Sequence, residues 1–90
     1  MTPSELLADP KNWTQFAFAR DANGDVVHTR MPSAVSFCLS GALKKCCVPN
    51  RETVLDRIIK ARGFWSVSDF NDDPSTKHAD VLSVLKEAGL

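Results

Sequence analysis

Hydrophobic and polar residues alternate with a period of two between Trp13 and Arg30, as they do in a pair of β-strands. Asn23-Gly24 lies inside this segment and is the strongest short signal for a two-residue type I′ turn. We therefore predict an antiparallel hairpin closed by that turn. The outer face of this hairpin carries His28 and Arg30. The inner face, packed on the core, carries Phe16, Phe18, Val27 and Met31.

Apolar residues at helical spacing mark four further segments. Thr2 and Glu5 fit a capping box around Pro3, so a short helix is expected at the start of the chain. Three longer helices are predicted from Ser33 to about Cys46, from 51 to 62 after an Asn50 cap, and from about Ser75 to Ala88.

Two features of these segments concern packing. Gly41 lies in the middle of a predicted helix, where glycine costs about 1 kcal/mol relative to alanine. We therefore expect another backbone to approach closely at this position. Phe64 and Trp65 lie between the last two predicted helices, and we expect them to pack on the core together with Val67 and Phe70.

The length of 90 residues fits one domain spanning residues 1–90. The predicted elements follow the order α-β-β-α-α-α. The fold class is therefore α+β, in which a two-stranded antiparallel hairpin packs on three to four helices.

Charge is balanced over the whole chain but not along it, with 11 basic and 11 acidic residues in total. Residues 41–63 hold six basic and two acidic residues, and two predicted helices in this region resemble a helix-turn-helix. A nucleic-acid binder would use Lys44, Lys45, Arg51, Arg57, Lys60 and Arg62. The zero net charge argues against this function, as does the spacing of Asp56 and Lys60, which allows them to pair.

Cysteine usage and hydropathy indicate the compartment. The chain has three cysteines, Cys38, Cys46 and Cys47, and a secreted disulfide scaffold would need a larger, even number. No apolar run approaches the roughly 20 residues of a membrane helix. We therefore expect a cytoplasmic protein with reduced thiols and no membrane partner.

The acidic segment near residue 70 is the most site-like cluster in the sequence. Its candidate metal ligands or acid-base groups are Asp69, Asp72, Asp73 and His78. The other reading is structural, because Asp and Asn favour turns and negative charge stabilises a helix N-terminus. We favour the structural role and assign no metal ligand and no catalytic residue.

Four blocks of the sequence resemble one family of small bacterial and phage proteins whose function is unknown. The blocks are WTQFAFARDANG at 13–24, CLSGAL at 38–43, FND at 70–72 and DVL at 80–82. Together they touch most of residues 13–88. Phe16 departs from the family pattern, in which a glycine is usual. The resemblance implies a bacterial or phage origin, and it supplies no activity, cofactor or catalytic residue.

These observations favour a non-catalytic interaction or accessory protein whose partner is another protein. The sequence contains no nucleophile elbow, phosphate loop or dinucleotide fingerprint, so we expect no cofactor. The expected contact residues are His28, Arg30, Arg57 and Trp65. A homodimer formed through the hairpin edge is a second form of the same hypothesis. A small metal-dependent or acid-base enzyme using the acidic cluster remains the alternative from another class.

Overall fold

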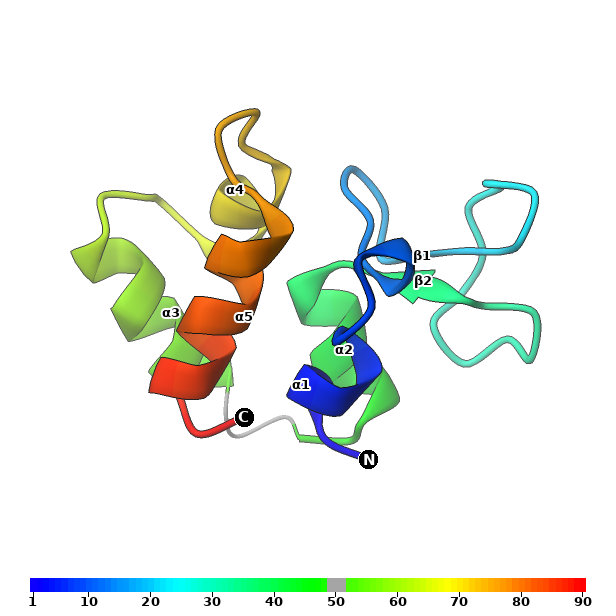
Figure 1. Ribbon diagram of the computed structural model, residues 1–90, viewed down its shortest axis with the longest axis horizontal. Coiled ribbons are helices and arrows are strands. Elements are labelled where there is room, and N and C mark those ends of the chain that lie inside the picture. The colour runs from blue at the N-terminus through cyan, green and yellow to red at the C-terminus, as the bar shows by residue number, and fades with distance from the viewer. Residues whose placement is uncertain (49–51) are drawn as a thin grey trace.

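The computed structural model describes residues 1–48 and 52–90, and it confirms the α+β class (Figure 1). A two-stranded antiparallel sheet is formed by β1 (Ala19–Arg20) and β2 (Ser36–Phe37). Five α-helices accompany it in the described part of the chain, with the 3-10 helix η1 (Pro10–Asn12) after the first. They are α1 (Pro3–Leu6), α2 (Leu39–Lys45), α3 (Glu52–Ala61), α4 (Val67–Asp72) and α5 (His78–Glu87).

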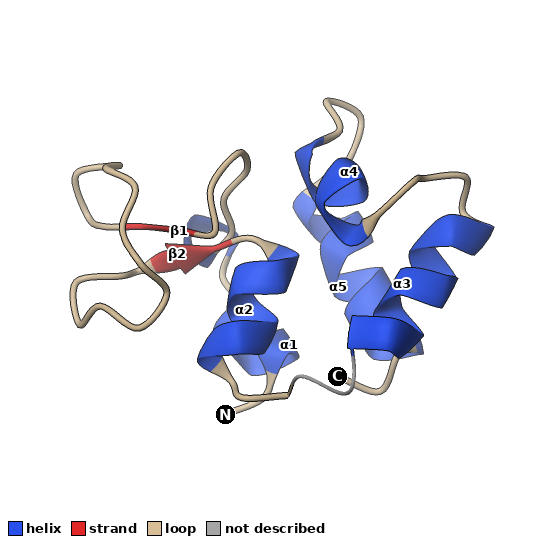
Figure 2. Cartoon of the chain, turned by 180° about the vertical axis from the view of Figure 1, so that it is seen from behind, coloured by secondary structure: helices blue, strands red, loops and turns tan. Residues whose placement is uncertain are grey.

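The helices form two groups that face each other across the core (Figures 1 and 2). One group consists of α3, α4 and α5. The other consists of α1 and α2, and the small sheet lies on its side of the molecule. Contacts of α2 with α4 and of α1 with α5 join the two groups. The largest fully buried apolar side chains are Leu7, Phe37, Leu39, Leu43, Leu55, Ile59, Val81, Val84 and Leu85.

The predicted hairpin pairing is wrong. β1 pairs with β2, in the register Ala19↔Phe37 and Arg20↔Ser36, and it meets residue 26 only through a single bridge from Arg20. A two-residue turn at Asn23-Gly24 would place Arg20 opposite Val27, whereas the bridge joins Arg20 to Val26, so the local register differs by one residue. A slip of one residue exchanges the faces of a strand pair. Ala19 accordingly lies in the core, and the backbone N–H of Val27 donates to its carbonyl oxygen at 3.1 Å.

The turn between these segments explains the slip. The carboxylate of Asp21 accepts hydrogen bonds from the backbone N–H groups of Asn23 and Asp25, at 2.9 and 3.0 Å. Of the Asn23-Gly24 pair, only Gly24 has a positive φ, at 84°. This arrangement closes a loop over residues 21–25, which is longer than the two-residue type I′ turn. As a result, Phe16, Phe18 and Met31 are exposed and not on the core face.

Helix boundaries also differ from the prediction. The helix expected from Ser33 begins only at Leu39, because Ser36 and Phe37 pair with β1 as a strand. The last helix begins at His78 and not near Ser75, because the carboxylate of Asp73 holds residues 73–75 in a turn. Helix α4, capped by Ser66, occupies the segment predicted to be a connection. The predicted Asn50 cap lies outside the described residues.

Two local predictions are confirmed. Thr2 and Glu5 form the expected capping box, with backbone-to-side-chain distances of 2.9 and 3.1 Å. A Cβ atom at Gly41 would lie 2.0 Å from the backbone carbonyl oxygen of Phe18, so this glycine does allow close approach of another backbone. The same carbonyl oxygen accepts a hydrogen bond from the backbone N–H of Cys38 at 3.2 Å.

Candidate functional site

Asn71 joins the two halves of the molecule through its side chain, which is 1% exposed. Its Oδ1 atom accepts from the indole N–H of Trp13 at 2.7 Å and from the backbone N–H of Leu39 at 3.0 Å. Its Nδ2 atom donates to the carbonyl oxygen of Thr14 at 3.0 Å and to the carboxylate of Asp72 at 2.9 Å. A buried amide must satisfy its donors and acceptors within the protein, and this one does so completely. Asn71 therefore fixes residues 13–14 and the start of α2 against α4.

The next residues of the chain are held by the end of α4. The side-chain amide of Gln15 donates to the carbonyl oxygen of Asn71 at 2.9 Å. The backbone N–H of Phe16 donates to Oδ1 of Asp72 at 2.9 Å. A carboxylate at a helix C-terminus opposes the helix dipole, so the donors to Asp72, the Phe16 backbone N–H and the Asn71 side-chain amide, offset an otherwise unfavourable position. The segment 13–16 is thereby fixed along α4.

Phe16 is held in an unusual conformation at this point. Its φ is 65°, in the left-handed region that only glycine adopts readily, and its side chain is 71% exposed. The left-handed conformation costs roughly 1–2 kcal/mol for a residue with a Cβ atom. The aromatic ring recovers little of this by burial. Such strain is found where the surrounding structure over-determines a backbone, often at binding sites.

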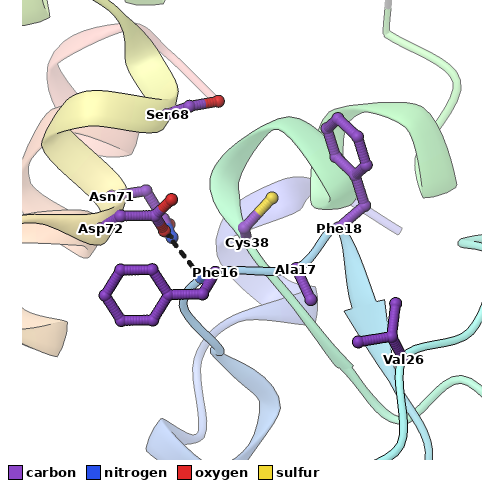
Figure 3. Close-up of a pocket in the computed structure, with 8 residues that line it drawn as sticks. All are labelled: Phe16, Ala17, Phe18, Val26, Cys38, Ser68, Asn71 and Asp72. Atoms are coloured by element: carbon purple, nitrogen blue, oxygen red, sulfur yellow. Dashed lines mark hydrogen bonds between the residues drawn. The ribbon is translucent and has the colours of Figure 1, made fainter.

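An apolar cleft of about 420 Å³ lies beside this strained residue (Figure 3). Phe16, Phe18 and Val26 line it, and they are 71%, 49% and 65% exposed. Helix α4 forms the opposite wall with Ser68, Asn71 and Asp72. The cleft thus combines a concave apolar surface with a few fixed polar groups at one end, as ligand sites do. We refer to it below as the apolar cleft.

The thiol of Cys38 also lines the apolar cleft (Figure 3). Its sulfur accepts a hydrogen bond from the backbone N–H of Gly41 at 3.2 Å and so caps the N-terminus of α2. Burial raises the pKa of the Cys38 thiol, and the hydrogen bond from that backbone N–H acts in the opposite direction. A neutral, buried thiol is a poor nucleophile. Its arrangement suits a structural cap.

Comparison with known proteins places the chain in a family. A model described as "Family of unknown function (DUF6197)" matches residues 4–89, which includes every residue of the apolar cleft. The chain belongs to DUF6197. No curated protein and no solved structure matches it. The resemblance to a family of unknown function, expected from the sequence, is therefore confirmed.

In this DUF6197 chain each of the three carboxylates of the acidic segment makes its own local hydrogen bonds. Asp69 accepts from the backbone N–H of Trp65 at 3.2 Å, near the N-terminus of α4. Asp72 holds Phe16, as described above. Asp73 accepts from the backbone and hydroxyl of Ser75, and these hydrogen bonds lower the pKa of the Asp73 carboxyl. These contacts match the structural reading of the segment.

The ring of His78 lies beside Leu7 and Trp13. Its Nε2 lies 2.6 Å from the carbonyl oxygen of Leu7, and its ring centroid lies 6.3 Å from that of Trp13. Within residues 1–48 and 52–90, no three His, Cys, Asp or Glu side chains lie together in a group able to hold a metal ion. The structure therefore does not bring the predicted metal-ligand candidates together.

Of the four expected contact residues, His28 and Arg30 line one hollow, and neither Arg57 nor Trp65 lines it. Trp65 is 87% exposed and does not pack on the core, which corrects the prediction for it, whereas its neighbour Phe64 packs against Phe70 with ring centroids 5.0 Å apart. Arg57 is exposed on α3. The hollow lined by His28 and Arg30 has a volume of about 410 Å³. Trp65 is exposed because α4 begins directly after it and directs Val67 and Phe70 inward.

The basic segment is partly neutralised. Lys60 pairs with Asp56 at 3.0 Å, as its spacing predicts, and Arg62 pairs with Glu87 at 2.9 Å. Arg51 lies outside the described residues. Helix α3 packs on α4 and α5, whereas α2 packs on α1 and α4. No described helix is long and apolar enough to cross a bilayer.

Sequence reasoning missed the apolar cleft because it placed Phe16 and Phe18 in the core. One signal pointed to the cleft. The resemblance implies a glycine at position 16, and the positive φ of Phe16 is the conformation that a glycine adopts readily. A position built for glycine but occupied by phenylalanine is a poor candidate for an ordinary strand. Asn71 lay inside the acidic segment considered above, but its partners were not predicted.

Proposed function

We propose that this protein is a non-catalytic interaction module of bacterial or phage origin that acts in the cytoplasm. In this proposal the apolar cleft binds apolar side chains of a protein partner. The observation that carries the proposal is the exposure of Phe16, Phe18 and Val26 around one concave surface. The three cysteines, all free thiols, fit a reducing compartment.

The energetics of the apolar cleft favour binding. Each exposed aromatic side chain can remove apolar area from water when a partner covers it, at about 25 cal/mol per Å². The backbone of Phe16 is fixed by the carboxylate of Asp72, so binding does not have to order the backbone at this position. Aromatic residues in fixed positions are the usual anchors of protein interfaces.

The polar groups at the apolar cleft support binding better than catalysis. All four hydrogen-bonding positions of the Asn71 side chain are used within the fold. The thiol of Cys38 caps α2, and burial raises its pKa. The Asn71 amide and the Cys38 thiol are therefore not available to activate a substrate. They are suited to holding the walls of the cleft in place.

The proposal is tested by capture of partners from cells of the source organism, using wild-type protein and two variants. Phe16→Ser removes an aromatic ring from the apolar cleft, and Trp65→Ser removes a more exposed aromatic ring outside it. We expect at least one protein to be retained by the wild type and by Trp65→Ser but lost with Phe16→Ser. The same dependence must hold when that protein is purified and titrated.

Two results would contradict this proposal. Equal retention of all captured proteins by Phe16→Ser and the wild type would show that the apolar cleft is not used. Sedimentation of the purified protein as a dimer that Phe16→Ser dissociates would identify a second copy of this chain as the occupant, in place of a different protein.

A further inference from the structure

The apolar cleft is the first of three hollows that follow one another across the surface. A smaller hollow of about 100 Å³ shares two wall residues with it, Phe18 and Val26. The hollow of about 410 Å³ shares three wall residues with that smaller one, His28, Thr29 and Lys44. Because neighbouring hollows share wall residues, the three lie next to one another in a row. We call this row the long groove.

The long groove is charged oppositely at its two ends. Asp72 lies at the end beside α4. Its Oδ1 atom accepts hydrogen bonds from the Phe16 backbone N–H and the Asn71 side-chain amide. Its other carboxylate oxygen accepts no hydrogen bond from the residues that the structure describes. Arg30 and Lys44 line the far end. One acid, Glu52, also lines the far end, where its carboxylate accepts from Ser40 at 3.4 Å. Two cations against one carboxylate leave that end positive.

Lys44 marks the point where the apolar part of the groove becomes basic. Its ammonium group lies 4.2 Å from the centroid of the Phe18 ring, within the range of a cation–π contact. This contact holds the cation at the edge of the apolar surface. An acidic group that enters next to an apolar side chain would therefore meet Lys44 directly.

We infer that the partner segment bound in the long groove is an extended peptide with a basic residue at one end, apolar residues in the middle and an acidic residue at the other end. This inference rests on the proposed function, because it assumes that a protein partner occupies the apolar cleft. The basic residue pairs with Asp72, and the acidic residue pairs with Lys44 and Arg30. Opposite charge at both ends sets the direction in which the peptide lies.

Selection from a random dodecapeptide library displayed on phage tests the inference without knowledge of the natural partner. The expected result is enrichment of peptides in which apolar residues separate a basic residue from an acidic one. Two pairs of variants locate the binding. Phe16→Ser is compared with Trp65→Ser, and Lys44→Glu with Lys45→Glu, because Lys45 is also exposed in α2 but does not line the groove.

The affinities of one enriched peptide give the decisive comparison. We expect Lys44→Glu to weaken binding roughly five- to tenfold at low salt, with a smaller effect at 0.5 M salt, and Lys45→Glu to change it less than about twofold. Replacing the acidic residue of the peptide by lysine should restore its affinity for Lys44→Glu.

The other outcomes separate this inference from the function on which it rests. Peptides that need Phe16 but show no charge preference, and bind Lys44→Glu as well as the wild type, would overturn the inference and leave the proposed function standing. If no peptide is enriched, or if every enriched peptide binds Phe16→Ser unchanged, both are overturned.

Discussion

Replacement of Asn71 by alanine is the most direct test of how the site is built. The change removes four hydrogen bonds at once and leaves three groups without their partner, the Trp13 indole N–H, the Leu39 N–H and the Thr14 carbonyl. Leu39 is fully buried, whereas Trp13 and Thr14 are half-buried and can recover part of the loss from water.

The magnitude follows from these three environments. An unsatisfied buried group costs about 1–3 kcal/mol, and a lost partly exposed hydrogen bond costs about 0.5–1.5 kcal/mol. We therefore expect Asn71→Ala to lower the free energy of unfolding by about 3–5 kcal/mol. A domain of this size has only about 5–13 kcal/mol in total. The corresponding fall in Tm is roughly 20 °C.

Urea denaturation followed by far-ultraviolet circular dichroism measures this change. Ser68→Ala is the matched control, because Ser68 is exposed on the same helix and lines the same cleft. It should alter stability by less than about 0.5 kcal/mol. Trp13→Phe removes one bond of the four and should cost about 1 kcal/mol. A loss below about 1 kcal/mol for Asn71→Ala would refute the assignment of Asn71 as the joint between the two halves.

Three further predictions concern the same region. Helix propensity alone predicts that Gly41→Ala raises the free energy of unfolding by about 1 kcal/mol. Because the Cβ atom would lie 2.0 Å from the Phe18 carbonyl oxygen, we expect urea denaturation to show a net loss of about 2 kcal/mol or more. A gain in stability would refute the close approach. Phe16→Gly should raise the free energy of unfolding by about 0.5–1 kcal/mol, because relief of the strain at positive φ exceeds the entropy cost of glycine. No gain in stability would show that the backbone is unstrained. Ellman's reagent should label exposed Cys47 first and Cys38 only on unfolding, since burial hides the Cys38 thiol and raises its pKa; rapid labelling of Cys38 in folded protein would contradict its burial.

The elements that sequence reasoning predicted well are those specified by neighbours within a few residues. The capping box links Thr2 and Glu5, three positions apart, and the ion pair links Asp56 and Lys60, four positions apart. The role of Gly41 was also predictable, because glycine in mid-helix has a cost that packing must offset. For the capping box and the ion pair, the signal and its structural consequence lie in the same segment, whereas the backbone that approaches Gly41 is that of Phe18.

The sheet could not be predicted in this way. Alternation between Trp13 and Arg30 fits a strand equally well whichever segment is its partner. The choice of Ser36–Phe37 as partner depends on the Asp21 turn and on contacts with Thr14, and a change of one residue in register exchanged the two faces. Residues 33–38 were therefore assigned to a helix that begins only at Leu39.

The apolar cleft was hidden for the same reason. Its walls come from residues 16–18, Val26, Cys38 and α4, and only the fold brings these segments together. Asn71 stood out in the sequence only as one polar residue among carboxylates. Its hydrogen-bond partners lie 32 to 58 residues away along the chain, apart from adjacent Asp72. Such distant pairing leaves no local pattern for a sequence argument to detect.

The wide separation of the partners of Asn71 also sets when the cleft can exist during synthesis. A nascent chain that has emerged as far as α2 already carries Phe16, Phe18 and Cys38. The backbone N–H of Leu39, the first residue of α2, still lacks its acceptor, because Asn71 emerges only with α4. Contacts of such high sequence separation form late in folding. A partner that recognises the cleft would thus ignore immature chains and bind only finished ones.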